Sequence, residues 1–404
     1  MTTTVGSATT PAWIPRGGEA WRDPFDDYRA LRDEDPIHHA VVDGGDFWVL
    51  SRFQNVFDAA RDTTTFSSAH GLTHKPGDDP ETLGLAAPPI VMLDPPDHTE
   101  FRRLVTKGFR PRAVAELEPE VRAFVVERIE RIRQTGTADI VAELFKPLPS
   151  LVVAHFLGVP PEDRYLFDGW TENIVAANAR GNALDAAEAS TNLFDYFGRL
   201  LERRRVEPGD DTVSDLVHAG LDDDTEVMRI LGFAFTMVTG GNDTTTGLLG
   251  GAAQLLTEFP DQRRILLNHP ALLPEAIEEL LRLTSPVQNL ARTTTRPVTL
   301  HDVEIPQGRK VMLLYAAANR DDREFGPDAE AFRARRKIAK HLAFSYGAHH
   351  CLGAPAARLA ARVALEELLA RCPNFTVDAA AGRFAPGEFV RRYESLPFSA
   401  DSFM

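Results

Sequence analysis

Cys351 is one of two cysteines among 404 residues, and its neighbours are of the kinds that thiolate or metal chemistry uses. It stands in "FSYGAHHCLGAPAARLA", behind two histidines, with Gly347 and Gly353 on either side. Pro355 and the apolar residues spaced three and four apart predict a helix that begins at or just after the cysteine. The positive end of that helix and nearby backbone N–H groups lower the pKa of a thiol and favour the thiolate, which is the form that binds metals. We therefore expect a thiolate at the mouth of a helix.

Four explanations of this thiol stay open on the residues alone. A buried structural cysteine is the commonest fate of a lone Cys. A zinc site made of His349, His350 and Cys351 is disfavoured, because adjacent ligands have poor geometry and no CxxC partner exists. A nucleophile needs a base and an orienting group, which spacing does not locate. The fourth explanation is an axial thiolate on haem iron.

A second stretch, "GGNDTTT" at 240–246, interrupts a long helical pattern with residues that favour helices poorly. Each Gly costs about 1 kcal/mol relative to Ala in a helix interior, and Asn, Asp and Thr are also unfavourable. One interpretation is a packing notch or a kink, since Thr can hydrogen bond to the carbonyl four residues earlier. The other is a site where a flat ligand lies on bare backbone, with Asp243 and Thr244 available for proton transfer.

The elements that must position these residues are mostly helical. The central pattern runs from a capping box at Asp223 and Glu226 to Pro260, and ~33 residues at ~1.5 Å each give roughly 50 Å. A hairpin is predicted around Asp43-Gly44-Gly45, and alternation over 297–315 predicts a second small sheet. Without a convincing linker, we expect one large domain, although length alone favours two or three. Further helices are predicted at 113–133, 151–158, 190–206 and 274–283.

Composition limits the classes of function. The formal charge of −15 argues against generic nucleic-acid binding and against adhesion to an anionic membrane surface. With 43% hydrophobic and 25% charged residues, the chain is ordinary for a globular protein. Two cysteines do not make a disulfide framework, and neither a basic apolar leader nor a long apolar run is present. We expect a cytoplasmic protein without a membrane segment, whose residues 1–17 are flexible and whose domain spans 18–404.

The spacing Phe344-x-x-Gly347-x-x-x-Cys351-x-Gly353 resembles the haem-binding signature of the cytochrome P450 family. Three further matches follow in the order of that family. "GGNDT" resembles the oxygen-activating kink of its central helix, Glu279-x-x-Arg282 its ExxR pair, and "DPPDHTEFRRL" at 94–104 the segment that binds haem propionates. An isolated ExxR pair is a weak signal, because such helix pairs are usually solvated. The resemblance implies a single-domain triangular prism, mainly α with small β-sheets.

The resemblance also implies roles for individual residues. Cys351 would be the proximal ligand of the iron of haem b, within the loop formed by Phe344, Gly347 and Gly353. Glu279 and Arg282 would brace the fold around this loop. The haem propionates would be held by His98, Arg102, Arg292 and His349.

The implied reaction is the insertion of one oxygen atom from O₂ into a mostly apolar small molecule, by hydroxylation or epoxidation. Thr244 would hold the activated oxygen through its hydroxyl, and Asp243 would deliver protons from solvent. Gly240 would widen the space over the haem. The resemblance places the substrate pocket near Val91, Thr236, Thr239, Gly240, Val287, Asn289 and Tyr393.

Electrons would come from outside the chain, since no flavin or iron–sulfur pattern is present. The resemblance implies a ferredoxin and an NAD(P)H-dependent ferredoxin reductase, and azole-type ligands are plausible. The basic run "RARRKIAK" at 333–340, with Arg358, is either a docking patch for an acidic partner or a solvated turn. Alternatives are a peroxide-driven or nitric-oxide-reducing enzyme and, less favoured, a non-catalytic haem carrier or sensor.

Overall fold

The computed structural model describes residues 13–42, 45–83, 87–167, 169–170, 173, 187–219 and 224–400. Three features predicted from the sequence lie outside these residues. They are positions 1–12 of the N-terminal segment, the Asp43-Gly44 part of the hairpin turn, and the Asp223 cap of the central helix.

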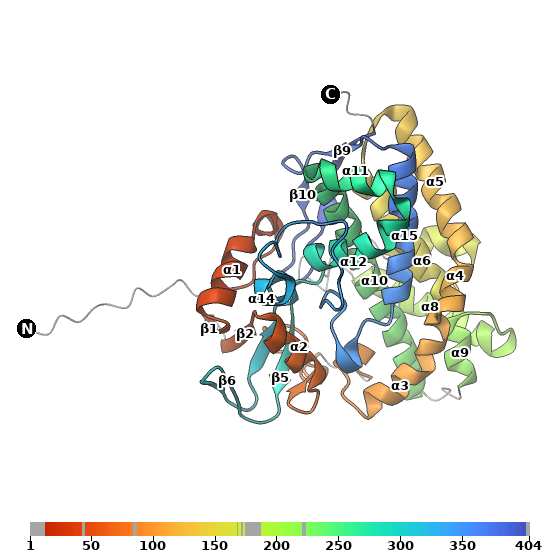
Figure 1. Ribbon diagram of the computed structural model, residues 1–404. Helices are drawn as coiled ribbons and strands as arrows, with labels where there is room; N and C mark the ends of the chain where they lie inside the picture. Colours follow the sequence, from red (N-terminus) through yellow and green to blue (C-terminus); the bar gives the residue numbers. More distant parts are fainter. Residues whose placement is uncertain are drawn as a thin grey trace, which may run out of the picture.

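Helices dominate the described chain, and the long ones occupy the right of Figure 1. The short helices are η1 (Gly18–Arg22), η2 (Ile90–Met92), η3 (Thr106–Phe109), the π-helix η4 (Val141–Phe145), η5 (Pro161–Asp163), η7 (Pro270–Leu272) and η8 (Gly347–His349). The α-helices are α1 (Phe25–Glu34), α2 (Phe53–Arg61), α3 (Asp97–Val105), α4 (Pro111–Glu116), α5 (Glu118–Thr135), α6 (Pro147–Phe156), α8 (Ala187–Val206), α9 (Thr212–His218), α10 (Asp224–Glu258), α11 (Pro260–Asn268), α12 (Leu273–Thr284), α13 (Tyr315–Ala318), α14 (Asp322–Phe325) and α15 (Ala354–Arg371).

A mixed five-stranded sheet stands on the left of Figure 1, with α1 and α2 beside it. Its order is β1-β2-β8-β5-β3, and only the β2–β8 pair is parallel. Its strands are β1 (Ile37–Val42), β2 (Gly45–Leu50), β3 (Phe66–Ser67), β5 (Leu290–Thr294) and β8 (Lys310–Leu313). The smaller sheets pair β6 (Val298–Leu300) with β7 (Val303–Ile305), β10 (Arg383–Phe384) with β11 (Tyr393–Ser395), and β4 (Thr137–Asp139) with β12 (Pro397–Ser399) and β9 (Thr376–Val377).

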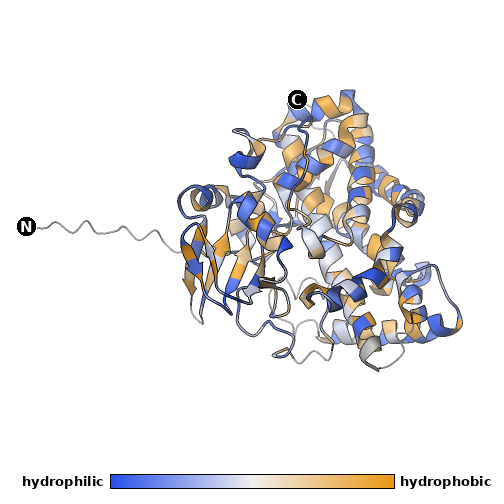
Figure 2. Cartoon of the chain, turned by 60° about the horizontal axis from the view of Figure 1, so that its bottom comes forward, coloured by the Kyte–Doolittle hydropathy of each residue, from blue (hydrophilic) through white to orange (hydrophobic). Residues whose placement is uncertain are grey.

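The predicted elements are present, with one difference. Periodicity over 113–133 predicted one helix, but α4 and α5 meet at Leu117, because Pro119 lacks an N–H and starts a new helix. The central helix α10 is 35 residues long, close to the ~33 expected, and remains helical through Gly240 and Gly241. Its hydrophobic face packs in the largest core cluster, against α6, α12 and α15. Along most helices hydrophobic and hydrophilic residues alternate (Figure 2).

The glycine at 241 has a packing role in this core. A Cβ built on Gly241 would lie 2.7 Å from a methyl group of Val153 on α6. Gly241 therefore lets α6 approach α10 closely, which is the packing notch that the sequence allowed as one interpretation.

Residues 13–17 differ from the expectation of a flexible segment. The ring of Trp13 packs edge-on against Tyr28, with centroids 6.1 Å apart. Gly17 lies against the backbone of Gly387, where a Cβ would collide with the carbonyl. The indole of Trp21 then donates to the same carbonyl at 2.9 Å. The start of the described chain is thus attached to the loop before β11.

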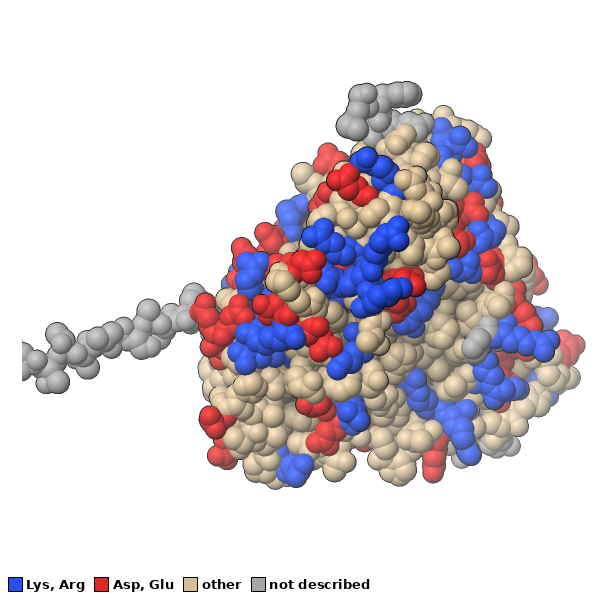
Figure 3. Space-filling model, viewed as in Figure 1, with Lys and Arg blue, Asp and Glu red and all other residues tan. Residues whose placement is uncertain are grey.

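The molecule is mainly helical with small sheets and forms a single domain with a roughly triangular outline (Figure 3), as predicted. Helix α12 packs against α10 and α15 and also contacts α13, which follows strand β8 of the sheet (Figure 1). Within the described ranges, no helix is both long and apolar enough to cross a lipid bilayer.

Candidate active site

The cysteine loop is held in place from both ends. Cys351 follows η8 and precedes α15, which begins at Ala354, so the predicted helix after the cysteine is confirmed. Its backbone N–H donates to the Phe344 carbonyl at 3.0 Å. Gly347 has a φ of +72°, and a Cβ there would lie 3.0 Å from the Ala60 carbonyl of α2. Both the backbone conformation and this close approach require glycine at 347.

Cys351 is exposed to solvent, but protein atoms lie close around its thiol. Desolvation by these atoms raises the pKa of the thiol. Backbone hydrogen bonds from Gly353 and Ala354 and the charges of Arg102 and Arg358 oppose this effect without overcoming it. The lowered pKa predicted from the helix end is therefore wrong for the isolated thiol, because desolvation outweighs the helix end. A cation in front of the sulfur would favour the thiolate.

Phe344 packs beneath this loop, between helix and loop residues. The Arg358 guanidinium lies 4.7 Å from the centre of its ring, and the rings of His341 and His350 lie 5.9 and 6.2 Å away. The Arg358 side chain is therefore engaged with the loop.

Glu278 on α12 joins the two ends of this loop, a role that sequence reasoning missed. Its carboxylate accepts from Arg358 Nε at 2.7 Å and contacts His341 Nε2 at 3.1 Å. Burial acts to raise the pKa of Glu278, but Arg358 and His341 together lower it to about 2. The carboxylate is thus charged near neutral pH and ties residues 341 and 358 to α12.

Glu279 and Arg282 form a fully buried network on the next turn of α12. Arg282 donates to both carboxylate oxygens of Glu279, at 2.7 and 2.8 Å, and to the carbonyls of Asn319 and Ala329 at 2.6 Å. Arg336 completes the network through Glu279 Oε1 at 3.0 Å. These contacts fix the 319–336 segment to α12.

This network removes one residue, Arg336, from the basic run at 333–340 that was expected to lie at the surface. The Arg336 side chain is only 13% exposed, because it lies between Glu279 and the Phe325 carbonyl. Arg333 and Lys337 are ion-paired with Asp328 and Glu275. Arg335 is exposed.

The four basic residues expected to bind propionates lie in one neighbourhood. His98 and His349 have ring centroids 4.2 Å apart. Burial lowers the pKa of both imidazoles, that of His349 to about 2, and the charges of Arg102 and Arg292 lower them further. His349 Nε2 lies 3.1 Å from the Ser68 hydroxyl. Two guanidinium groups and two neutral imidazoles therefore surround one region of the structure.

The partners of this cluster suit a ligand with carboxylate groups. His98 is 1% exposed, and its Nδ1 is buried without a hydrogen-bond partner. Arg292 is 3% exposed and donates to the Ala291 carbonyl. Arg102 donates to the carbonyls of Ala348 and His350 at 3.0 and 2.6 Å, so it also supports the cysteine loop. A buried guanidinium group and an unpaired imidazole nitrogen suit a ligand that carries carboxylate groups, such as the propionates of haem.

One face of α10 is open at its middle. Gly240 is exposed, and a Cβ built there would meet no atom within 4 Å. Thr244, one turn later, is partly exposed and donates its hydroxyl to the Gly240 carbonyl at 2.8 Å. Thr236 and Thr239 are also partly exposed and bond back to carbonyls four residues earlier. Neighbouring glycines thus differ, since Gly241 is packed and Gly240 borders free space.

Asp243 is ion-paired with a residue that sequence reasoning missed. Its Oδ1 lies 2.5 Å from Arg392 Nε, and both residues are 7% exposed. Burial raises the pKa of Asp243 to about 6, against the opposing charges of Arg392 and Lys146. A carboxyl group with this pKa can gain and lose a proton near neutral pH. The two residues are 149 positions apart in the chain, and no local sequence pattern indicates that they meet.

Of the four residues expected to line the substrate pocket outside α10, two are half-buried and two are buried. Val91 is half-buried on η2, and Val287 pairs with Val390 in an isolated bridge. Asn289 is buried and donates to the Glu388 carbonyl at 2.9 Å. The 287–289 segment therefore lies beside the 388–390 segment.

Tyr393 does not join these residues. It is 2% exposed and donates to Gln254, ten positions after Thr244 on α10, which corresponds to roughly 15 Å along the helix. Its ring stacks on Phe384, with centroids 4.1 Å apart. Tyr393 is a core residue, and placing it in the substrate pocket was wrong.

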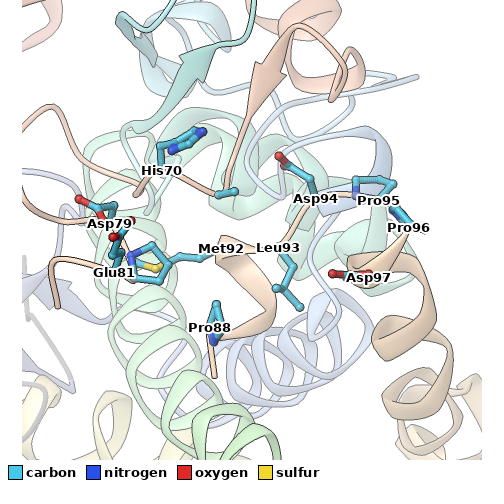
Figure 4. A pocket seen from close by; sticks show the side chains of 12 residues that line it. His70, Asp79, Glu81, Pro88, Met92, Leu93, Asp94, Pro95, Pro96 and Asp97 are labelled. Carbon is cyan, nitrogen blue, oxygen red and sulfur yellow. The ribbon is translucent and has the colours of Figure 1, made fainter. Parts of the chain in front are cut away.

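A separate pocket of ≈ 420 Å³ opens beside η2 (Figure 4). Cys351 and the open face of α10 are not among its lining residues. It is lined by Ala69, His70, Asp79, Pro80, Glu81, Pro88, Met92, Leu93, Asp94, Pro95, Pro96 and Asp97. Asp94 also accepts from the backbone of Ser68, the partner of His349, so this pocket borders the basic cluster.

Comparison with known proteins agrees with this geometry. The family model described as Cytochrome P450 matches residues 265–400. The chain is 57% identical to cytochrome P450 130 of Mycobacterium tuberculosis over 392 residues, which cover 95% of this chain and 96% of the relative. It is 35% identical to the vitamin D(3) 25-hydroxylase of Pseudonocardia autotrophica, with 89% of each chain covered.

Solved structures show the same fold. CYP109E1 of Bacillus megaterium in complex with testosterone has a TM-score of 0.82 and 31% identity, covering 94% of this chain and 100% of that one. The polyketide-synthase cytochrome P450 PksS of Bacillus subtilis has a TM-score of 0.86 and 29% identity, covering 96% and 100%. The chain therefore belongs to the cytochrome P450 family and is a haem-iron monooxygenase that uses O₂ and an organic substrate.

Proposed function

We propose that this protein is a cytoplasmic monooxygenase that takes two electrons from a ferredoxin and inserts one oxygen atom into a mostly apolar small molecule. The cofactor is haem b, held by the domain formed by residues 18–404. The observation that carries the proposal is the Cys351 thiol, which faces open space inside a loop fixed to α12 and α2. When bound there, haem supplies iron that accepts the thiolate and activates O₂.

In this proposal, the chain positions the cofactor from two sides. Cys351 would hold the iron through its sulfur, and the backbone N–H groups of Gly353 and Ala354 would stabilise the charge of the thiolate. His98, Arg102, Arg292 and His349 bind the two propionates. Support comes from the unpaired His98 Nδ1 and from the two guanidinium groups beside it.

The open face of α10 carries the proton chemistry. Gly240 leaves space beside the helix, and the Thr244 hydroxyl is able to turn from the Gly240 carbonyl toward that space. Asp243, with a pKa of about 6, takes a proton from water and passes it to the Thr244 hydroxyl. These two residues are proposed as the catalytic acid and its relay.

The substrate lies against Val91, Thr236, Thr239, Gly240, Val287 and Asn289. These side chains mix apolar and mildly polar groups, and three of them lie on the open face of α10. Relatives whose names mention testosterone and vitamin D(3) support a compact apolar substrate class. Azole compounds, whose ring nitrogen coordinates iron, are proposed to bind in the same space.

The ferredoxin docks on the face shown in Figure 3, where Lys and Arg side chains gather in the middle of the view. The basic run contributes Arg335, which is exposed, and Arg333 and Lys337, which are ion-paired at the surface. An acidic ferredoxin would be attracted to this patch by complementary charge.

A turnover experiment tests the proposal. Thr244→Ala is expected to retain haem and substrate binding but to lose at least about tenfold in product formed per electron, with hydrogen peroxide released instead, because the hydroxyl relay is missing. Product and peroxide are measured with ferredoxin, reductase, NAD(P)H and O₂, and separately with peroxide alone. Thr257→Ala is the matched control, since Thr257 makes the same back-bond on α10, to Ala253. Unchanged coupling in Thr244→Ala would remove Thr244 from its role, and turnover with peroxide alone would favour a peroxide-driven enzyme.

A further inference from the structure

Trp21, on η1, contacts both ends of one loop. The loop comprises residues 387–391, between β10 and β11. The indole Nε1 of Trp21 donates to the Gly387 carbonyl at 2.9 Å, and the Trp21 carbonyl accepts from Arg391 Nε at 2.7 Å. Trp21 is 2% exposed, so both contacts are shielded from water. One residue near the start of the described chain therefore holds the 387–391 loop at its first and last positions.

Two glycines allow the N-terminal segment to lie directly on this loop. Gly387 has a φ of +111°, a conformation that favours glycine. A Cβ built on Gly17 would collide with the Gly387 carbonyl. Further along, the Arg391 guanidinium lies 5.5 Å from the centre of the Phe25 ring on α1. The N-terminal segment thus covers the outer side of the 387–391 loop.

The inner side of the loop is hydrogen-bonded to residues 286–289. The Arg391 N–H donates to the Pro286 carbonyl at 2.8 Å, and the Gln288 N–H donates to the Phe389 carbonyl at 2.7 Å. These bonds join the two backbones into one layered unit, whose outer layer is the loop.

The N-terminal region also reaches the inner layer of this unit. The hydroxyl of Tyr28 on α1 donates to Gln288 Oε1 at 3.0 Å. The amide of Gln288 in turn donates to the Ser285 carbonyl at 2.6 Å. Tyr28 is buried. Residues 21 and 28 therefore fix the two layers from the same side of the molecule.

Both layers pack against the middle of α10 at Gly247. A Cβ built there would lie 2.6 Å from the Arg391 carbonyl oxygen and 3.2 Å from Pro286 Cβ. Gly247 follows Gly240 by seven residues, which is two turns, so the two glycines share one face of the helix. Thr244 lies between them, only three positions before Gly247. The unit held by Trp21 therefore borders the open face of α10.

Two of the residues expected to line the substrate pocket belong to the inner layer. Val287 bridges to Val390, and Asn289 donates to the Glu388 carbonyl at 2.9 Å. The Glu388 carboxylate lies 3.0 Å from Lys75 Nζ, which joins the loop to a third segment. The position of the 387–391 loop thus sets the position of one wall of the proposed pocket.

We propose that Trp21 is a positioning residue for the substrate pocket, which holds the 387–391 loop, and with it Val287 and Asn289, beside the open face of α10. This inference rests on the proposed function, because it concerns a ligand bound over the haem. The ligands affected are those that extend beyond the iron to the wall of the pocket. A role of Trp21 in packing alone would change stability but would not separate ligands by size.

The test compares two azoles of different reach on the haem-loaded protein. Imidazole and 4-phenylimidazole both bind iron through a ring nitrogen, and the optical shift of the haem gives each dissociation constant. Trp21→Phe keeps an aromatic ring but loses the indole N–H. It should bind 4-phenylimidazole about three- to tenfold more weakly, as expected for one lost hydrogen bond, and imidazole within about twofold of wild type. Arg391→Gln removes the other contact of residue 21 and should give the same pattern, so the test does not depend on one variant.

Hydrogen exchange measures the anchoring itself. The amides of Gln288 and Arg391, which bond across the two layers, should exchange faster in both variants than in wild type. Arg22→Gln is the matched control, because Arg22 lies on the same η1 but donates to the carbonyls of Ala379 and Gly382, outside the loop. It should keep the wild-type exchange rates and both dissociation constants.

Three results would overturn the inference. They are unchanged exchange in both variants, faster exchange without loss of 4-phenylimidazole affinity, and equal weakening of the two azoles. If neither azole shifts the haem spectrum of the wild type, the proposed haem site fails and the inference fails with it. If Thr244→Ala stays fully coupled while the azoles behave as expected, the proton-delivery role fails and the positioning role of Trp21 stands. The two failures are therefore distinguishable.

Discussion

The two regions that face the proposed haem are built differently. The cysteine loop is joined to α12 by Glu278, which binds Arg358 and His341. Beside it lies a buried network in which Arg282 binds both oxygens of Glu279 and two backbone carbonyls. This network reaches the start of the loop through Asn319, whose side-chain oxygen accepts from the Leu342 N–H at 2.7 Å. On the open face of α10, polar side chains bond back to their own helix. Asp243, buried beside that face, makes one close contact, with Arg392 at 2.5 Å.

This difference matches the two proposed roles, because a metal ligand must stay in place and a proton relay must exchange hydrogen-bond partners. A ligand sulfur must stay at one position, and a network whose donors and acceptors are satisfied resists local opening. A proton relay must exchange partners, which requires contacts that open at small cost. The burial of both carboxylates is similar, but Glu279 has three arginine or backbone partners and Asp243 has one close cation.

The largest change in the free energy of unfolding is expected from removing the charge of Glu279. Glu279→Gln leaves Arg282 and Arg336 without their shared anion in a buried site, which should lower the free energy of unfolding by about 3–5 kcal/mol. Glu275→Gln, on the same helix but exposed with Lys337, should change it by less than about 1 kcal/mol. Thermal unfolding of the two purified variants measures the difference. Equal stability would show that the cysteine loop does not depend on this network.

Smaller changes in the free energy of unfolding are expected from replacing each of the two neighbouring glycines of α10 by alanine. Gly240→Ala should stabilise the protein by up to about 1 kcal/mol, because alanine favours helices and its Cβ meets open space. Gly241→Ala should instead destabilise it by about 1–3 kcal/mol, because its Cβ would collide with Val153. Denaturant unfolding compares the pair. Destabilisation by both substitutions would mean that Gly240 does not border free space.

The parts that the sequence predicted are those set by local spacing. The helix after Cys351, the glycine at 347 and the Glu279–Arg282 pair each follow from residues within a few positions, and the structure places them as expected. The run of poor helix formers around Asp243 left a packing notch, a kink or a ligand site open, and in the structure packing and side-chain back-bonds keep the helix continuous.

The parts that the sequence could not predict depend on contacts between distant segments. Arg392 reaches Asp243 because Gly247 admits the 391–392 backbone, and no local pattern encodes that approach. Arg336 looked like a surface charge in a basic run, but the fold buries it against Glu279. Tyr393 was expected near the substrate pocket, but it lies in β11 with its ring buried in the core. Its place also depends on contacts between distant segments.

The central claim is that the Cys351 sulfur is bonded as a thiolate to haem iron, and its most direct test is the optical spectrum of the reduced carbon monoxide adduct. The wild-type protein should show the absorption typical of thiolate coordination, and Cys351→Ser should lose it while remaining folded. An adduct with the absorption typical of imidazole coordination in the wild type, or an unchanged spectrum in Cys351→Ser, would contradict the account.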